Sequence, residues 1–208
     1  YRAKKAGCPP SRVVYAGVGK THVEIEEAIR TGILLFNVES IQELDRIEQA
    51  ARRLKRNVNV SLRLNPGVDP GTHEHVTTGT SESKFGLDLD AAHQIFKCRG
   101  QYPHLSICGV HVHIGSQIVR GEPFLKAFRK VLIFLTHLEH EGYRIRFLNL
   151  GGGLGIIYSD ERPQTAEQFA RRILPLFKGR AYRLIFEPGR FIAGNSGISA
   201  WSRDRNSF

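Results

Sequence analysis

A short apolar run at residues 184–186 is followed at once by Glu187, Pro188 and Gly189. The run is too short for a helix and is bounded by a turn, so it predicts a buried strand that ends at Glu187. Barrels and open sheets carry their chemistry at the carboxyl ends of parallel strands. Glu187 is therefore a candidate site residue, and the competing interpretation is an exposed acid beside a turn.

Three consecutive glycines at 151–153 follow another predicted strand. They permit close backbone approach and leave several N–H groups to face one anion, which favours a phosphate site over a merely flexible turn. The third glycine of a dinucleotide fingerprint would fall on Ile156, so that motif is excluded. Val14 stands where a nucleotide-binding loop needs its first glycine, so the run GVGKT at 17–21 is incomplete.

His111 and His113 are two residues apart on a predicted strand, so both imidazoles point to one face. Such a pair can bind metal in a hydrolase barrel, but the sequence offers no clear third and fourth ligand, and no metal is expected. We expect His111 to be a core histidine. His113 is the better candidate, because its flat ring lies near the strand end, where Ser116 could donate to a phosphate.

One ligand would use all of these groups. It carries a phosphate, a flat aromatic ring and a ring atom that needs a carboxylate, and pyridoxal phosphate has all three. Glu187 beside the pyridine nitrogen would keep that nitrogen protonated, which makes the ring an electron sink for a carbanion at the substrate's α-carbon.

These residues must be positioned by alternating strands and helices. Strands are predicted at residues 12–16, 33–38, 58–64, 107–113, 145–150 and 183–186. Helices are predicted to begin at the capping boxes Thr21/Glu24, Ser40/Glu43 and Thr165/Gln168, at Asp90, and near Glu122. The helical residues expected to face the core include Val23, Ala28, Ile29, Phe124, Phe128, Val131, Leu135 and Leu138. The alternation calls for parallel strands, and the polar, glycine-rich strand ends favour most of an eight-stranded barrel over a doubly wound sheet.

The composition is that of one ordinary globular domain, with 208 residues, 41% hydrophobic and 24% charged. No apolar run approaches the roughly 20 residues that cross a bilayer, and the N-terminus lacks a signal sequence, so a soluble cytoplasmic protein is expected. Three cysteines without metal spacing predict reduced thiols. The formal charge of +10 is spread along the chain, which argues against a nucleic-acid partner.

The motifs together resemble the diaminopimelate decarboxylases, which belong to the fold type III, alanine-racemase-like class of pyridoxal-phosphate enzymes. The resemblance extends to about Ser199 and rests on YAGVGK (15–20), FNVES (36–40), RLNP (63–66), TG (78–79), SKFG (83–86), HVHIGSQI (111–118), NLGGGLG (149–155) and EPGR (187–190). It implies residues 1–199 as a pyridoxal-phosphate-binding α/β barrel domain, a partial (β/α)8 barrel of about six units. Residues 200–208 are expected to be a divergent tail.

The resemblance also implies roles for single residues. His113, the catalytic candidate, would stack on the cofactor ring, Glu187 would pair with the pyridine nitrogen, and Arg63 would lie near the phenolic oxygen. Arg190 would in addition reach the substrate carboxylate. The other residues implied to bind the cofactor, mostly around its phosphate, are Ser116, Gly152, Gly153, Pro188, Gly189 and Arg190.

The implied activity is the decarboxylation of meso-2,6-diaminopimelate to L-lysine by an intact homodimer. One alternative is a related decarboxylase of another basic amino acid or of a carboxylated polyamine. The other is an inactive homologue that acts by binding a partner.

The departures from the family pattern are also informative. The chain contains no methionine, which indicates a segment of a longer protein. The first two barrel strands, the Schiff-base lysine and the C-terminal β-domain are expected to be missing, and Lys4 and Lys5 are assigned to a surface helix. We therefore expect the segment alone to be inactive, with two strand edges exposed.

Overall fold

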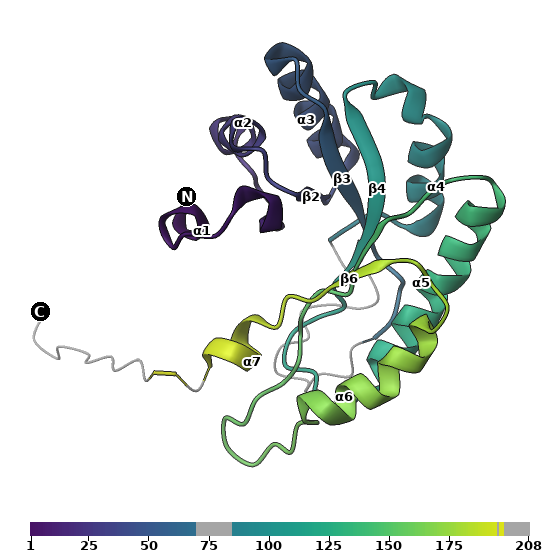
Figure 1. Cartoon of the computed structure of the whole chain (residues 1–208). Coiled ribbons are helices and arrows are strands. Elements are labelled where there is room, and N and C mark those ends of the chain that lie inside the picture. The colour runs from purple at the N-terminus through teal and green to yellow at the C-terminus, as the bar shows by residue number, and fades with distance from the viewer. Residues whose placement is uncertain (70–84, 195, 198–208) are drawn as a thin grey trace, which may run out of the picture.

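The computed structural model describes residues 1–69, 85–194, 196 and 197, and its centre is one curved sheet of six parallel strands (Figure 1). The strands follow one another across the sheet in chain order, and each pairs in parallel with the next. Their bounds are β1 (Val14–Tyr15), β2 (Leu35–Val38), β3 (Val58–Leu64), β4 (Leu105–Val112), β5 (Phe147–Asn149) and β6 (Arg183–Ile185). This order confirms the predicted partial (β/α)8 barrel.

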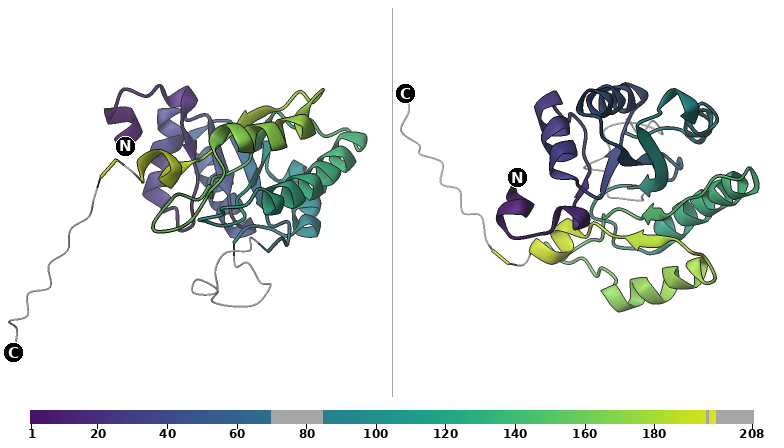
Figure 2. Two further views of the ribbon diagram at one scale, coloured as in Figure 1. Left: turned by 90° about the horizontal axis from the view of Figure 1, so that it is seen from below. Right: turned by 45° about the horizontal axis from the view of Figure 1, so that its top comes forward.

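Helices between consecutive strands cover the outer, convex side of the sheet, and one short helix precedes β1 while another follows β6 (Figure 2). Their bounds are α1 (Arg2–Lys5), α2 (His22–Thr31), α3 (Ile41–Leu54), α4 (Leu89–Lys97), α5 (Glu122–His140), α6 (Ala166–Ile173) and α7 (Gly189–Ala193). The motif residues at 78–79 and 83–84 and the predicted tail at 200–208 lie outside the described residues.

Two of the three predicted capping boxes form in both directions, at Thr21 and at Thr165. Ser40 accepts the N–H of Glu43 at 3.2 Å, but the return bond from the Glu43 carboxylate is absent. Glu43 Oε2 instead accepts the N–H of Glu39 at 3.1 Å, and Glu43 Oε1 lies 2.6 Å from the ammonium of Lys20. The box prediction at Ser40 was therefore half wrong, because both carboxylate oxygens of Glu43 have other partners.

The N-cap of α4 is Asp88, not the predicted Asp90. The Asp88 carboxylate accepts the N–H of Ala91 at 2.7 Å, which is the bond that defines an N-cap. Asp90 instead lies in the first turn of the helix, where a negative charge is favourable.

The core lies between the sheet and its helices. All five core predictions for α5 are confirmed, since Phe124, Phe128, Val131, Leu135 and Leu138 are each at most 1% exposed. On α2 the predicted Ala28 and Ile29 are buried, but Val23 is 74% exposed. The opposite face of the helix faces the core and buries Ile25. Two residues along a helix correspond to a rotation of about 200°, so Ile25 lies opposite Val23.

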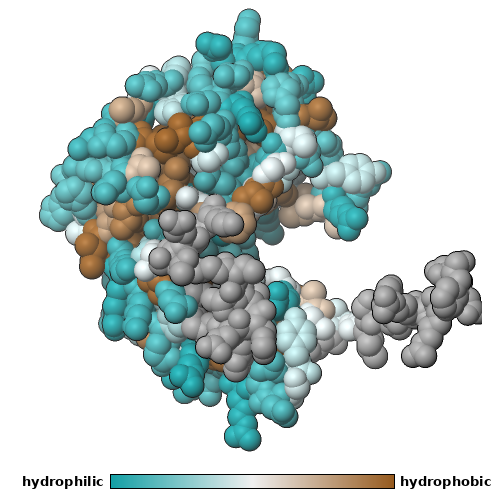
Figure 3. Space-filling view, turned by 180° about the vertical axis from the view of Figure 1, so that it is seen from behind, coloured by the Kyte–Doolittle hydropathy of each residue, from teal (hydrophilic) through white to brown (hydrophobic). Residues whose placement is uncertain are grey.

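The sheet is open on one side, because β1 and β6 stand at opposite ends of the strand order and do not pair among the described residues. Figure 3 shows the resulting C-shaped outline. The final strand was predicted to be buried through Phe186, but it ends at Ile185 and Phe186 is 41% exposed. An edge strand has a neighbour on one side only, which accounts for the difference and matches the exposed edges that we expected.

No helix in the described part of the chain is both long and apolar enough to pass through a bilayer. Cys8, Cys98 and Cys108 are free thiols. Lys4 and Lys5 are exposed on α1, which confirms their assignment to a surface helix.

Candidate functional site

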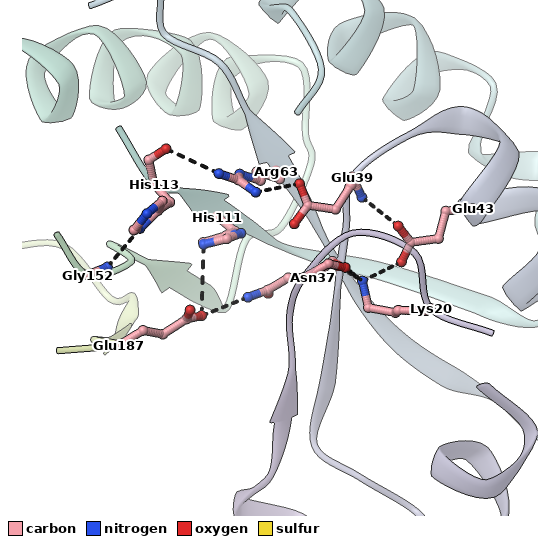
Figure 4. Close-up of polar contacts among 10 residues, drawn as sticks. Lys20, Asn37, Glu39, Glu43, Arg63, His111, His113, Gly152 and Glu187 are labelled. Atoms are coloured by element: carbon pink, nitrogen blue, oxygen red, sulfur yellow. Dashed lines mark hydrogen bonds and ion pairs between the residues drawn. The ribbon is translucent and has the colours of Figure 1, made fainter. Parts of the chain in front are cut away.

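Glu187 follows β6 directly, and its carboxylate points toward the interior of the curved sheet (Figure 4). Its N–H donates to the carbonyl of Gly151 at 2.7 Å, which fixes the backbone beside the glycine run. One carboxylate oxygen, Oε1, accepts from the side-chain amides of Asn37 at 3.0 Å and Asn149 at 2.6 Å. The other oxygen, Oε2, takes neither bond.

Asn37 and Asn149 are fully buried, in β2 and β5 respectively. Sequence reasoning did not select them as site residues. The signal was present, because each asparagine interrupts a short apolar strand that is otherwise buried, and a buried amide needs partners. Asn149 Oδ1 also accepts the N–H of Gly151 at 2.9 Å, so this side chain holds both the acid and the glycine turn.

His113 lies just beyond β4, with its ring fixed by the glycine run. Gly152 N–H donates to His113 Nδ1 at 3.2 Å, so a neutral ring carries its proton on Nε2. Burial, with a smaller contribution from the nearby Arg63 guanidinium, lowers the pKa of His113 below its ordinary value. The ring is therefore neutral at pH 7 and held in one orientation, which suits stacking on a planar ligand.

His111 is 2% exposed, as predicted for a core histidine, and neither ring nitrogen has a hydrogen-bond partner among the described residues. Its Nε2 lies 3.8 Å from Glu187 Oε1, too far for a hydrogen bond. Burial, helped by Arg63, His113 and Lys20, lowers the pKa of His111 well below its ordinary value. The ring is consequently neutral, and no ion pair forms with Glu187.

The three glycines at 151–153 pack backbone against backbone. A Cβ on Gly151 would lie 2.3 Å from the carbonyl oxygen of Val112, and one on Gly152 would lie 2.0 Å from that of Glu187. A Cβ on Gly153 would lie 2.2 Å from the carbonyl oxygen of Gly115. The run therefore joins the ends of β4, β5 and β6 at distances that only glycine allows.

We expected several free N–H groups in this run, and the structure corrects that expectation. The N–H groups of Gly151 and Gly152 donate to Asn149 and His113. Of the three glycine N–H groups, only that of Gly153 has no partner among the described residues. The first two glycines thus position other side chains.

Arg63 extends from β3 toward the same interior and is held by two groups. Its Nη1 lies 2.6 Å from Glu39 Oε2, in an ion pair that is almost buried, and its Nη2 donates to the carbonyl of His113 at 3.4 Å. Both contacts appear in Figure 4. Arg63 is thereby fixed beside His113.

Lys20 is a second buried cation, and sequence reasoning did not assign it a role. It is 4% exposed, and its ammonium donates to the carbonyls of Gly17 at 2.6 Å and Asn37 at 2.8 Å and pairs with Glu43 at 2.6 Å. Two hydrogen bonds and one ion pair thus hold the ammonium in place. Lys20 therefore supports the strand that carries Asn37.

The remaining predicted residues lie around the glycine run. Ser116 is exposed and follows Gly115, the residue that packs against Gly153. Pro188 packs near Gly152, while Gly189 and Arg190 begin α7 and are exposed. The structure thus brings together Glu187, His113, Arg63 and the glycines. It shows no contact from the Arg190 side chain to any of these within the described residues.

Comparisons with known proteins agree with this arrangement. Residues 1–194 match the family model described as "Pyridoxal-dependent decarboxylase, pyridoxal binding domain". The chain is 44% identical over 199 residues to diaminopimelate decarboxylase of Aquifex aeolicus, covering 95% of this chain and 47% of that protein. It is 43% identical to the Pseudomonas aeruginosa protein of the same name, and the match covers 95% of this chain and 48% of that protein. The chain thus spans about half the length of the curated relatives it matches.

Among solved structures, diaminopimelate decarboxylase from Helicobacter pylori complexed with L-lysine matches with a TM-score of 0.85 and 40% identity, covering 92% of this chain and 48% of that one. The lysine/ornithine decarboxylase from Vibrio vulnificus complexed with putrescine matches with a TM-score of 0.73, covering 91% and 47%. Its identity is 21%, so this second likeness supports the fold alone.

Proposed function

Because the chain belongs to the pyridoxal-dependent decarboxylases, whose pyridoxal-binding domain it carries, we propose that it forms the cofactor site of a diaminopimelate decarboxylase. The reaction would remove carbon dioxide from meso-2,6-diaminopimelate and give L-lysine. Relatives near 40% identity bear that name, and one of the matched structures was solved with L-lysine. The whole enzyme is proposed to be a cytoplasmic homodimer.

The residues present fit pyridoxal phosphate. An anionic carboxylate, a neutral flat ring and a glycine run with one unpartnered N–H lie at adjoining strand ends. When bound, this cofactor supplies an electron sink that draws charge from the substrate's α-carbon. The chain's own contribution is to place a charge, a stacking surface and hydrogen-bond donors around it.

In this proposal Glu187 faces the pyridine nitrogen through Oε2, since Asn37 and Asn149 both occupy Oε1. The two amides act as positioning residues that stop the carboxylate from turning. A fixed negative charge keeps a proton on the nitrogen opposite it. His113 covers one face of the ring, and its neutral state avoids placing a second positive charge beside the protonated nitrogen.

The phosphate would lie at the glycine run, where Gly153 N–H and the exposed Ser116 and Arg190 can donate to it. Gly189 and Pro188 form the turn that carries Arg190, and Gly152 holds the orientation of His113. Arg63 would approach the phenolic oxygen from the opposite side. Arg190 is also proposed to reach the substrate carboxylate.

Lys4, Lys5 and Lys20 are not placed for covalent attachment of the cofactor. Lys20 is buried but is engaged by three acceptors, and Lys4 and Lys5 are exposed on α1. We therefore expect this chain to bind pyridoxal phosphate without a covalent bond to these three residues. Borohydride treatment followed by peptide mass analysis should find no adduct on them.

The observation that carries the proposal is the two-amide clamp on Glu187 beside His113 and Gly152. The test is a titration of the folded chain with pyridoxal phosphate, followed by the cofactor's absorbance. Glu187→Ala should weaken binding about 10-fold or more, since hydrogen bonds to a charged group contribute about 1.5–3 kcal/mol. Glu167→Ala, which removes an exposed acid of α6, is the matched control and should leave binding unchanged.

Equal affinities of the wild type and Glu187→Ala would overturn the proposed site. Substrate choice is tested separately in the full-length protein that we propose contains this chain. Carbon dioxide release should be faster from meso-diaminopimelate than from ornithine, arginine or lysine. Faster release from one of those three would replace the proposed substrate while leaving the cofactor site intact.

A further inference from the structure

A second group of chemistry-bearing side chains lies on the outer surface, on helices α4 and α5, which run side by side (Figure 1). His93 belongs to α4, His137 lies in the last turn of α5, and Glu141 follows that helix directly. Because α5 starts from the carboxyl end of β4, its last turn lies toward the opposite end of the strands. The group is therefore separate from the cofactor site.

The three side chains converge on one point. His93 Nε2 lies 2.7 Å from Glu141 Oε2, and His137 Nε2 lies 3.2 Å from Glu141 Oε1. The ring centroids of His93 and His137 are 5.1 Å apart, and the angle between the two ring planes is 64°. One ligand atom from each residue falls within 4.8 Å of the others, and no other described group of histidine, cysteine or acidic residues does so.

This geometry is close to that of a transition-metal site. Zinc binds histidine nitrogen and carboxylate oxygen at about 2.0–2.2 Å, so two tetrahedral ligands stand roughly 3.3 Å apart. The observed separations of 2.7 and 3.2 Å need only small side-chain adjustments to reach that value. His137 and Glu141 are four residues apart, the helical spacing that places two ligands on one face.

The surroundings favour a preformed arrangement. Phe134 packs edge-on against His93 at 6.5 Å, which restricts that ring, and the His93 side chain is only 17% exposed. Lys97 lies close enough to Glu141 for its positive charge to oppose a bound cation.

We propose that His93, His137 and Glu141 bind one divalent transition-metal ion of the zinc class, with water in the remaining position. Two nitrogen ligands and one carboxylate select zinc, nickel, cobalt or copper over magnesium and calcium. Each imidazole would present the Nε2 lone pair to the ion and keep its proton on Nδ1. The bound ion would tie the C-terminal end of α5 to α4.

The test is calorimetric titration of the untagged, chelator-treated chain with zinc chloride at neutral pH. The wild type should show one saturable site per chain. His93→Ala and His137→Ala should each lower the zinc affinity at least about 10-fold. His140→Ala is the matched control, because it removes an exposed histidine from the same helix and leaves the three ligands in place.

Two further measurements test the choice of metal and the role of His137. Magnesium and calcium should give no saturable heat, and zinc should raise the melting temperature of the wild type and of His140→Ala but not that of His137→Ala. His137 is 59% exposed, so this variant is expected to fold. The proposal is overturned if zinc binds the wild type and both ligand variants equally, if no saturable binding occurs, or if His140→Ala loses as much affinity as His137→Ala.

Discussion

Asn37 donates its side-chain amide to Glu187 Oε1 across 3.0 Å, although the strands that carry them, β2 and β6, are separated by three other strands in the sheet. The contact therefore crosses the interior of the curved sheet instead of passing along it (Figure 4). It ties the tip of the last strand to the second strand. The position of the acid thus depends on the curvature of the sheet.

The two amides that hold Glu187 should not be equally important. Asn149 donates to Glu187 and accepts from Gly151, whereas Asn37 Oδ1 has no partner among the described residues. We expect Asn149→Ala to lower the free energy of unfolding by about 1–3 kcal/mol and Asn37→Ala by less, because a lost partner leaves a buried group unsatisfied. Urea unfolding of both variants measures this order. The reverse order would contradict the assigned contacts.

The glycine run should tolerate no side chain at Gly152. Its added Cβ would lie 2.0 Å from the carbonyl oxygen of Glu187, and this backbone atom cannot move without displacing the acid. Gly152→Ala is expected to destabilise the fold by about 1–3 kcal/mol or more and to abolish cofactor binding. Gly100→Ala has open space around it and should be nearly neutral. Thermal melting of both variants distinguishes the steric effect from a general glycine effect.

The buried His111 should make stability depend on pH. Its pKa is well below the ordinary value in the folded chain and returns to about 6.5 on unfolding. Because the unfolded state takes up the proton first, the free energy of unfolding should fall below about pH 6.5, by about 1.4 kcal/mol per pH unit for this residue. His113 contributes in the same direction.

The measurement for His111 is urea unfolding of the wild type and His111→Leu from pH 7 to pH 5. Leucine removes two ring nitrogens that have no partner among the described residues, so this variant should lose less stability on acidification than the wild type does. The difference between the two profiles isolates His111. Parallel profiles would show that the ring does not stay neutral in the folded chain.

Removing the charge of one partner of the Lys20–Glu43 pair should strongly lower the free energy of unfolding. Both side chains are at most 9% exposed and lie 2.6 Å apart. Glu43→Gln leaves a buried ammonium without its counter-charge, with an expected loss of about 3–5 kcal/mol. The exposed pair Arg171–Glu167 is the control, and Glu167→Gln should cost less than about 1 kcal/mol. Denaturant unfolding compares the two, and similar losses would contradict the buried role of the pair.

Local sequence signals were sufficient for much of this fold. Apolar runs placed all six strands, and Thr21 and Thr165 formed the boxes that their spacing predicted. Glu187 was found because a strand visibly stops there. The glycines were found because they are consecutive.

The missed features all depend on contacts between distant residues. Asn37 and Asn149 become site residues only when the sheet curls and brings both to Glu187. Glu43 does not complete its expected box, because one carboxylate oxygen pairs with Lys20 and the other accepts the N–H of Glu39. No local sequence pattern predicts these pairings. An asparagine within an apolar strand does indicate that a buried amide will need hydrogen-bond partners.

The central claim is that Glu187 holds the pyridine nitrogen of the cofactor in its protonated form. The direct measurement is the nitrogen NMR shift of isotope-labelled pyridoxal phosphate bound to the chain, at an alkaline pH at which the ring nitrogen of the free cofactor has lost its proton. The account predicts the protonated shift in the wild type and in Glu167→Gln, and the unprotonated shift in Glu187→Gln. An unprotonated nitrogen in the wild type, or the same shift in wild type and Glu187→Gln, would contradict it.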